Sequence, residues 1–270
     1  MDRLKRFLRA VLPYPILYVL RAVRGIYPGV DKLWTPFDGD YASFEEAAGH
    51  AVGYDDAEAA GAAADRLAQM VAETNPVEID GRFQQVHSAL CVARERLQKT
   101  RITVLDFGGG NGAYFFRLKD YFPDGFLDWH VVETPHMVAA CSPIGGGHIT
   151  FLKDIPAERI FDVAVVSGAL QYLPDAYIWL ERIAHASKWI ILTRLPVQDG
   201  PVDKFMVQTV TSHIHVGSMP IEIFSAAKMQ AAIDAVGTVE MSWRVALDEG
   251  SLATIGARPM GFLIKNLNPA

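Results

Sequence analysis

Five short apolar runs follow one another after Arg101, and they constrain the fold more than any other feature of the sequence. They are "ITVLDF", "DWHVVE", "ITFLK", "FDVAVVSG" and "KWIILTR". Short continuous apolar runs that end in turn residues are typical of strands buried on both faces. Because a helical or irregular stretch separates each run from the next, the sequence predicts an α/β fold with a mostly parallel, doubly wound sheet. Two later runs, "TVEMSWRVAL" and "MGFLIKN", predict a closing hairpin with an antiparallel C-terminal strand, for a total of about seven strands.

The chain before this pattern predicts helices and no strand. Residues 31–100 are expected to form a helical cap or lid. After a Gly-rich and aromatic loop, Ser43 with Glu46 three residues later has the form of a capping box, which begins a short helix. Two longer helices are predicted over 56–74 and 80–99.

The sheet domain is predicted to occupy residues 101–270. The regular spacing of strands ends after Arg194, and residues 195–220 form an insertion before a helix predicted over 225–236. In a doubly wound sheet, an insertion of this kind is a natural place for contacts with a second substrate. We therefore treat it as the candidate acceptor-site insertion.

The first thirty residues carry an excess of positive charge. Their apolar residues recur at helical spacing, so residues 1–30 predict a basic amphipathic helical segment. The apolar run "VLPYPILYVL" is too short to span a bilayer and contains two prolines, and no small-residue cleavage site follows it. Two interpretations of residues 1–24 stay open: a helix packed on the domain or on a partner, which is the more common role of an amphipathic helix, and a peripheral contact with an anionic membrane surface. The basic residues are Arg3, Lys5, Arg6, Arg9, Arg21 and Arg24, against the single acid Asp2.

The overall charge and the cysteines exclude several classes of function. A net charge of -6 and a pI near 5.7 argue against a nucleic-acid partner, because binding to phosphates needs an excess of Lys and Arg. Cys91 and Cys141 have no second cysteine or histidine at metal-ligand spacing, so neither a disulfide framework nor a metal site is expected. These observations favour small-molecule chemistry in a reducing cytoplasm, with the protein placed at the inner membrane if the N-terminal contact forms.

The first predicted strand runs directly into a glycine-rich loop. Such a loop, when it opens a helix, places backbone N–H groups and the positive end of the helix dipole at the carboxyl edge of the sheet. Gly108, Gly110 and Gly112 follow Asp106 with the spacing G-x-G-x-G. This spacing differs from the G-x-G-x-x-G of dinucleotide-binding folds. A pyrophosphate ligand is therefore disfavoured.

Polar residues follow the next three strands at the same edge. Glu133 ends the second strand, where a carboxylate can accept hydrogen bonds from both hydroxyls of a ribose. Asp154 follows the third strand within reach of an adenine amino group, and Ile155 beside it can cover the purine face. Ser167 and Gly168 end the fourth strand, and the residues expected to line the same crevice after them are Gln171 and Tyr172.

The segments "VLDFGGGNG", "VVETP", "FLKDIP" and "VVSGALQYLPD" together resemble the successive cofactor motifs of class I S-adenosylmethionine-dependent methyltransferases. The front segment "FDGDYASFEEAAGHAVGYD" is similar to the opening of an uncharacterised bacterial methyltransferase group associated with surface-polysaccharide genes. The resemblance covers roughly residues 34 to 265. It implies a Rossmann-like class I methyltransferase fold, S-adenosylmethionine as cofactor and a role in polysaccharide biosynthesis.

The resemblance also implies roles for individual residues. Asp106 would lie near the amino group of the cofactor, the backbone of residues 108–112 under its methionine part, Glu133 on the ribose and Asp154 on the adenine. One departure is "LQYLPD", which stands where such enzymes often have "LEHLPD", so a histidine base is not expected at that position. The further cofactor contacts predicted are Phe107, Gly108, Gly109, Gly110, Asn111, Gly112, Thr134, Ile155, Ser167, Gly168 and Gln84, with helix capping as the alternative for Asn111.

The candidates for a catalytic base lie in the insertion. His213 and His215 alternate, so they share one face of an extended segment, and a neutral imidazole can take a proton from an acceptor hydroxyl. The alternative is that both are structural or solvent-facing histidines. Lesser candidates are Gln208 and Tyr114, and the aromatic and amide groups expected to form a lid over the cofactor are Tyr41, Tyr54, Phe83 and Gln84.

The sequence thus predicts a methyltransferase that transfers a methyl group to a small-molecule or saccharide-linked acceptor. Two alternatives stay open at this point. One is a non-catalytic scaffold that binds the cofactor and docks on a membrane or partner, and the other is an oxidoreductase that uses a nicotinamide dinucleotide. No residue set specific to one acceptor, or to one oligomeric state, is present in the sequence.

Overall fold

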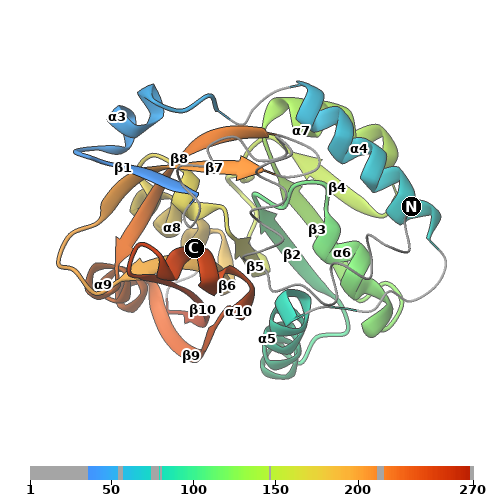
Figure 1. Ribbon diagram of the computed structural model, residues 1–270. Helices are drawn as coiled ribbons and strands as arrows, with labels where there is room; N and C mark the ends of the chain where they lie inside the picture. The colour runs from blue at the N-terminus through green and yellow to red at the C-terminus, as the bar shows by residue number, and fades with distance from the viewer. Residues whose placement is uncertain are drawn as a thin grey trace, which may run out of the picture. The chain divides into compact units, whose positions relative to one another are not determined.

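The structure is a computed structural model that describes residues 36–53, 57–73, 79, 81–145, 147–211 and 216–267. The elements discussed below all belong to one compact unit, Phe37–Ala270. The α-helices and strands are labelled in Figure 1. The predicted N-terminal helical segment, residues 1–30, lies outside the described residues.

Five parallel strands form the centre of the sheet, in the order β4-β3-β2-β5-β6. The order of the chain reverses between β2 and β5, which is the switch point of a doubly wound sheet. β10 (Ala257–Asn266) lies antiparallel beside β6, and β9 (Gly237–Arg244) lies antiparallel beside β10 (Figure 1). The predicted α/β Rossmann-like fold, including its antiparallel C-terminal strand, is confirmed. The five parallel strands are β2 (Ile102–Phe107), β3 (Leu127–Val132), β4 (Ile149–Leu152), β5 (Phe161–Ser167) and β6 (Ser187–Gln198).

Two apolar cores cover the two faces of this sheet. Along β2, Ile102 and Val104 contribute to one core, whereas Leu105 and Phe107 contribute to the other. The first core is completed by α4 (Ala57–Ala72), α5 (Gly81–Leu97), α6 (Ala113–Leu118) and α7 (Pro135–Gly145). The second is completed by α8 (Ala176–His185) and α9 (Ala226–Val236). Burial on both faces explains why these strands are continuous apolar runs in the sequence.

The helices of the front segment agree with the sequence. α3 (Phe44–Gly49) begins after Ser43, whose hydroxyl accepts a hydrogen bond from the Glu46 N–H at 3.2 Å. The Glu46 carboxylate in turn accepts from the Ala42 N–H at 2.7 Å, which completes the predicted capping box. α4 and α5 correspond to the two longer predicted helices.

Three strands are absent from the prediction: β1 (Phe37–Tyr41), β7 (Lys204–Thr211) and β8 (Val216–Ser225). The expected total of about seven is therefore too low, because ten strands are described. β7 pairs antiparallel with both β1 and β8, and the end of β8 pairs in parallel with Val197 and Gln198 of β6. β1, β7 and the first half of β8 are largely half-exposed, and the buried second half of β8 contains Glu222, so these strands lack the continuous apolar pattern that marks the central strands.

The remaining elements are short. They are η2 (Lys119–Tyr121) after α6, η3 (Leu170–Tyr172) after β5, and α10 (Ala246–Ala253) between β9 and β10. Within the described ranges, the chain has no helix that is both long and apolar enough to cross a membrane.

Candidate functional site

A cavity of about 560 Å³ opens at the carboxyl ends of the parallel strands. Its volume is in the range of small-molecule sites, and its position is where ligands bind in doubly wound sheets. Residues that end or follow β2 to β5 supply one part of the lining: Phe107, Gly108, Val132, Glu133, Thr134, Pro135, Lys153, Asp154, Gly168 and Ala169. The rest of the lining consists of Tyr172, Leu173, Trp179, Arg194, Met219 and Pro220.

The glycine loop after β2 has a backbone and surroundings that only glycine fits. Gly108, Gly110 and Gly112 have φ angles of 67°, 60° and 77°, in the left-handed region that side chains disfavour. A Cβ atom at Gly108 would lie 2.5 Å from the Cβ of Ala169, and one at Gly109 would overlap the carboxyl of Asp106. The loop therefore keeps its path only without side chains at these positions.

Glu133 braces this loop from the end of β3. Its Oε1 accepts a hydrogen bond from the Gly110 N–H at 2.9 Å, and its Oε2 accepts from the N–H of Thr134 at 2.9 Å. A carboxylate oxygen can accept more than one hydrogen bond, so these contacts are compatible with two ligand hydroxyls. The brace also places a negative charge where a dinucleotide fold offers free N–H groups to a pyrophosphate.

Asp106 lies under the loop and does not line the cavity. The side chain is 1% exposed, and its Oδ2 accepts a hydrogen bond from Trp129 Nε1 at 2.9 Å. Within the described part of the chain, its buried Oδ1 has no hydrogen-bond partner. Burial raises the pKa of Asp106 to about 7, against the effect of the Trp129 hydrogen bond, and the nearby charge of Glu133 contributes to the rise.

Asp154 and Trp179 lie on the β4 side of the cavity. Arg182 pairs with the Asp154 carboxylate at 3.1 Å and stacks its guanidinium over the Trp179 ring at 4.1 Å from the centroid. The Trp179 ring lies 5.2 Å from that of Phe107, so two aromatic rings meet at this part of the wall. Trp179 is not among the predicted residues, because a helical tryptophan after the fourth strand has no sequence pattern that separates it from a core residue.

Several predicted cofactor contacts have other partners in the structure. Gln84 donates from its amide to the Ile79 carbonyl at 3.0 Å, and Asn111 donates to the Ala63 carbonyl of α4 at 3.1 Å. Gly112, and not Asn111, is the N-cap of α6. The residues of the prediction that do not line the cavity are Asp106, Gly109, Gly110, Asn111, Gly112, Ile155, Ser167 and Gln84, and Gln171 is likewise not part of the lining.

Ser167 connects the end of β5 to α6. Its hydroxyl lies 2.7 Å from the hydroxyl of Tyr114, which is 8% exposed. Burial raises the pKa of the Tyr114 hydroxyl above its ordinary value. Ile155 packs at the edge of the core that α8 and α9 complete. Both residues therefore support the site from outside the lining.

Arg194 interrupts β6 at the cavity. Between Leu192 and Leu195, the residues Thr193 and Arg194 together face the single residue Gly261 of β10, which is a β-bulge. Arg194 has a φ of 59°, a left-handed conformation that disfavours a side chain by about 1–2 kcal/mol. Arg194 is not among the predicted residues, although a cation at the carboxyl end of the fifth predicted strand is a signal that the sequence contains.

The outer wall of the cavity comes from β8. Met219 and Pro220 line it, and the Tyr172 hydroxyl of η3 donates to Gln208 Oε1 of β7 at 2.6 Å, which connects the two parts. The predicted lid residues do not line the cavity: Tyr41 stacks on His50 and Phe83 packs against Tyr114. The residues of the prediction that lie outside the described ranges are Tyr54 and the candidate bases His213 and His215.

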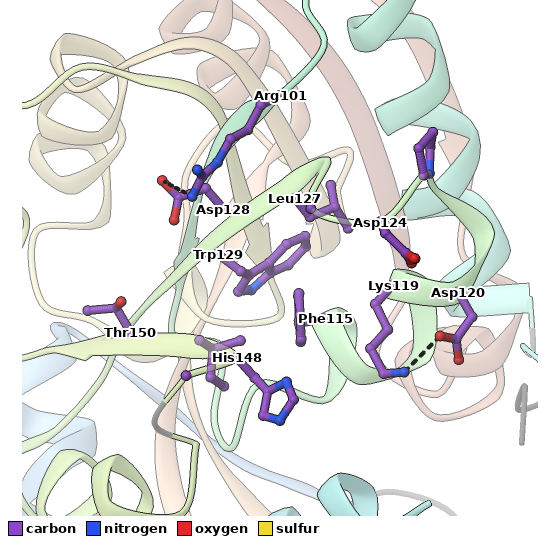
Figure 2. Close-up of a pocket in the computed structure, with 14 residues that line it drawn as sticks. Arg101, Phe115, Lys119, Asp120, Asp124, Leu127, Asp128, Trp129, His148 and Thr150 are labelled. Carbon is purple, nitrogen blue, oxygen red and sulfur yellow. Dashed lines mark hydrogen bonds and ion pairs between the residues drawn. The ribbon is translucent and has the colours of Figure 1, made fainter. Parts of the chain in front are cut away.

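A second cavity, of about 490 Å³, opens at the opposite edge of the sheet, near the amino ends of β2, β3 and β4. Figure 2 shows that its charged side chains meet one another, with Arg101 beside Asp128 and Lys119 beside Asp120. The nitrogen-to-oxygen distances are 3.5 Å and 2.7 Å. None of the predicted cofactor residues lines this cavity. In the part of the chain that the structure describes, no cluster of His, Cys, Asp and Glu could hold a metal ion.

No protein-family model and no curated protein sequence matches the chain. Among solved structures, it is similar to the N-terminal domain of EvdMO1, crystallised in the presence of SAH and D-fucose, with 13% identity, a TM-score of 0.49 and coverage of 75% of this chain and 95% of that one. It is also similar to 1,6-didemethyltoxoflavin-N1-methyltransferase from Burkholderia thailandensis, with 17% identity, a TM-score of 0.47 and coverage of 86% and 93%. A third is an S-adenosylmethionine-dependent methyltransferase from Clostridium acetobutylicum, with 10% identity, a TM-score of 0.47 and coverage of 75% and 98%. Likeness at these values identifies neither an activity nor a substrate for this chain.

Proposed function

We propose that this chain is an S-adenosylmethionine-dependent methyltransferase that acts on a small-molecule or saccharide-linked acceptor. The observation that carries the proposal is the hydrogen bond between the Gly110 N–H and Glu133 at 2.9 Å. Because of this hydrogen bond, the Gly110 N–H donates to the Glu133 carboxylate and is not available to a ligand phosphate. A loop braced in this way favours a cationic nucleoside over a pyrophosphate, because the added negative charge repels phosphate.

The other residues of the site fit this cofactor. Asp106 lies buried under the loop, so its carboxyl would favour an ammonium group above the loop through its negative potential and not through a direct hydrogen bond. Glu133 stands at the strand end where a ribose is held in doubly wound folds. The apolar surface of Phe107, Leu173 and Trp179 suits the flat face of an adenine.

When bound, this cofactor supplies a methyl group that its sulfonium already activates. The chain then has to hold an acceptor atom in line with that methyl group and keep water away. Orientation of this kind can supply about 7–11 kcal/mol of the barrier, whereas a general base supplies about 3–5 kcal/mol. We expect positioning by the walls of the cavity to dominate, and we keep His213 and His215 as candidate bases.

Calorimetric titration with S-adenosylmethionine and, in parallel, with NAD tests the cofactor. Binding of S-adenosylmethionine and not of NAD is expected. Absence of S-adenosylmethionine binding at millimolar ligand, or preferential binding of NAD, would contradict the proposal. Release of S-adenosylhomocysteine in the presence of cell extract separates an enzyme from a scaffold that only binds the cofactor.

We further propose that the protein works in the cytoplasm, at the inner membrane, on polysaccharide precursors. The support is the basic sequence of residues 1–24 and the similarity of the front segment to the polysaccharide-associated group. Co-sedimentation with vesicles that contain anionic lipid, compared with neutral vesicles, tests the membrane contact. Equal recovery with both kinds of vesicle would exclude an electrostatic contact.

A further inference from the structure

Among the described residues with a side chain, three have a positive φ angle, and Arg194 is the one within a strand. The other two, Gln98 and Asp175, lie next to helix ends. Bulges next to active sites re-aim a side chain, and strain retained in a strand points to a use for it. Arg194 lines the cavity, so the bulge places a permanently cationic side chain there.

The cavity extends across more strands than the proposed cofactor contacts use. Those contacts follow β4, β3 and β2 and include Gly168 at the end of β5, whereas Arg194 belongs to β6. Neighbouring strands lie about 4.8 Å apart, so β6 is roughly 10 Å from β2. The side over β6, closed by Met219 and Pro220 of β8, is therefore the space that we assign to the acceptor.

We propose that Arg194 recognises an anionic group, a carboxylate or a phosphate, on the methyl acceptor. The proposal rests on the proposed methyltransferase function. An arginine can hold either anion through two parallel hydrogen bonds, and this fixes orientation as well as position. The neighbouring Met219 and Pro220 offer apolar surface, whereas Glu133 and Asp154 lie at the β3 and β4 side.

The contact of Arg194 with β5 supports this placement. A Cβ atom at Gly168 would lie 3.3 Å from Nη1 of Arg194, so the guanidinium rests against a backbone without a side chain. Gln171 of η3 contacts the Arg194 carbonyl at 3.4 Å, and Trp243 Nε1 donates to Thr193 Oγ1 at 3.3 Å. The bulge is thus held from both sides.

The test uses the full chain saturated with S-adenosylhomocysteine, titrated with glucose, glucuronate, glucose 1-phosphate and inorganic phosphate. We expect at least one of the anions to bind at least ten-fold more tightly than glucose. Arg194→Gln should remove this preference, and Arg101→Gln, in the cavity at the other edge of the sheet, should leave it unchanged. The carboxylate and phosphate probes distinguish the two sources of negative charge.

A second variant separates the loss of anion binding from misfolding of the chain. Glycine favours the backbone conformation of residue 194, so Arg194→Gly should fold with an unchanged or higher Tm and still lose the preference for anions. Equal binding of glucose and the anions by the wild type, or an anion preference that survives in both variants, overturns the proposal.

The remaining alternative is that Arg194 holds the carboxylate of the cofactor itself. Binding of S-adenosylhomocysteine and of 5′-methylthioadenosine, which lacks that carboxylate, separates the two. Weakening of the first ligand alone by Arg194→Gln overturns the acceptor proposal, whereas unchanged binding of both supports it. Failure of the wild type to bind S-adenosylhomocysteine would contradict the proposed function, and titration of the cofactor-free chain with the same anions then tests Arg194 separately.

Discussion

The two cavities at opposite edges of the sheet are of similar volume, about 560 Å³ and 490 Å³, and differ in how their charged groups are held. At the amino edge, side chains pair with side chains near the surface, as Arg101 does with Asp128. At the carboxyl edge, Asp154 also pairs with a side chain, that of Arg182, but Glu133 is held by backbone N–H groups and Arg194 stands on a strained bulge. The number of charged residues in a cavity thus indicates little about its function, whereas the interactions that hold those residues in place indicate more.

The largest effect is expected from Glu133→Ala. The variant loses the brace of the glycine loop and the proposed contacts with the ribose. Each hydrogen bond to a charged group contributes about 1.5–3 kcal/mol, so affinity for S-adenosylmethionine should fall at least about a hundred-fold. Calorimetry measures this, with Asp124→Ala in the amino-edge cavity as the matched control. Similar losses in both variants would remove the distinction between the cavities.

The next effect concerns the pH dependence of stability. The pKa of Asp106 is raised from 3.8 to about 7 in the folded chain, so the folded state keeps a proton that the unfolded state releases. The free energy of unfolding should therefore fall as pH rises from about 4 to 7 and level off above 7, by at most about 4 kcal/mol. Asp106→Asn should remove this decline, as measured by urea unfolding at a series of pH values. An unchanged decline in the variant would assign it to another group.

Two glycine variants, one in each cavity, compare the stability cost of adding a Cβ atom at the two edges of the sheet. Gly108 and Gly125 both have a positive φ, of 67° and 70°, and each lines one of the cavities. A Cβ at Gly108 meets Ala169, whereas one at Gly125 has no neighbour within 4 Å. Gly125→Ala should cost about 1 kcal/mol of stability from backbone strain, and Gly108→Ala about 1–3 kcal/mol more from overpacking. Denaturant unfolding measures both, and equal losses would argue against the close approach.

The smallest effect is expected from Arg101→Ala. Its partner Asp128 is 3.5 Å away, and the arginine side chain is 65% exposed. Exposed pairs contribute about 0–1 kcal/mol, so the variant should change the free energy of unfolding by less than about 1 kcal/mol. Binding of S-adenosylmethionine should change less than about two-fold in calorimetry. A larger change in binding would connect the amino edge to the ligand.

The central sheet was predictable because its strands are buried on both faces. Val104 and Leu105 point to different cores and are both fully buried, and this leaves a continuous apolar run in the sequence. β7 and β8 gave no such signal. They pair with each other, β7 pairs with β1, and Ile221, Ile223 and Phe224 of β8 are buried, and these contacts join residues far apart in the chain.

The lining residues that could be predicted are those whose residue type and place at the end of a strand already indicate a contact with a ligand. Phe107, Gly108, Glu133, Thr134, Asp154 and Gly168 line the cavity as the sequence predicts. The bracing of the glycine loop by Glu133 could not be predicted, because it depends on the distance between two strand ends. Arg194 depends on a bulge, which is visible only in the pairing of β6 with β10.

The segment that carries β7 and β8 begins after Gln198 at the end of β6 and ends at Ser225, and these two residues pair with each other. The two ends of this segment are therefore adjacent, as the ends of an insertion into an existing fold are. Such a segment can be lengthened, shortened or exchanged between related chains while β6 and α9 keep their places. In the proposed methyltransferase, replacing this segment would change the wall on the acceptor side, whereas the strand ends that carry the proposed cofactor contacts would keep their places.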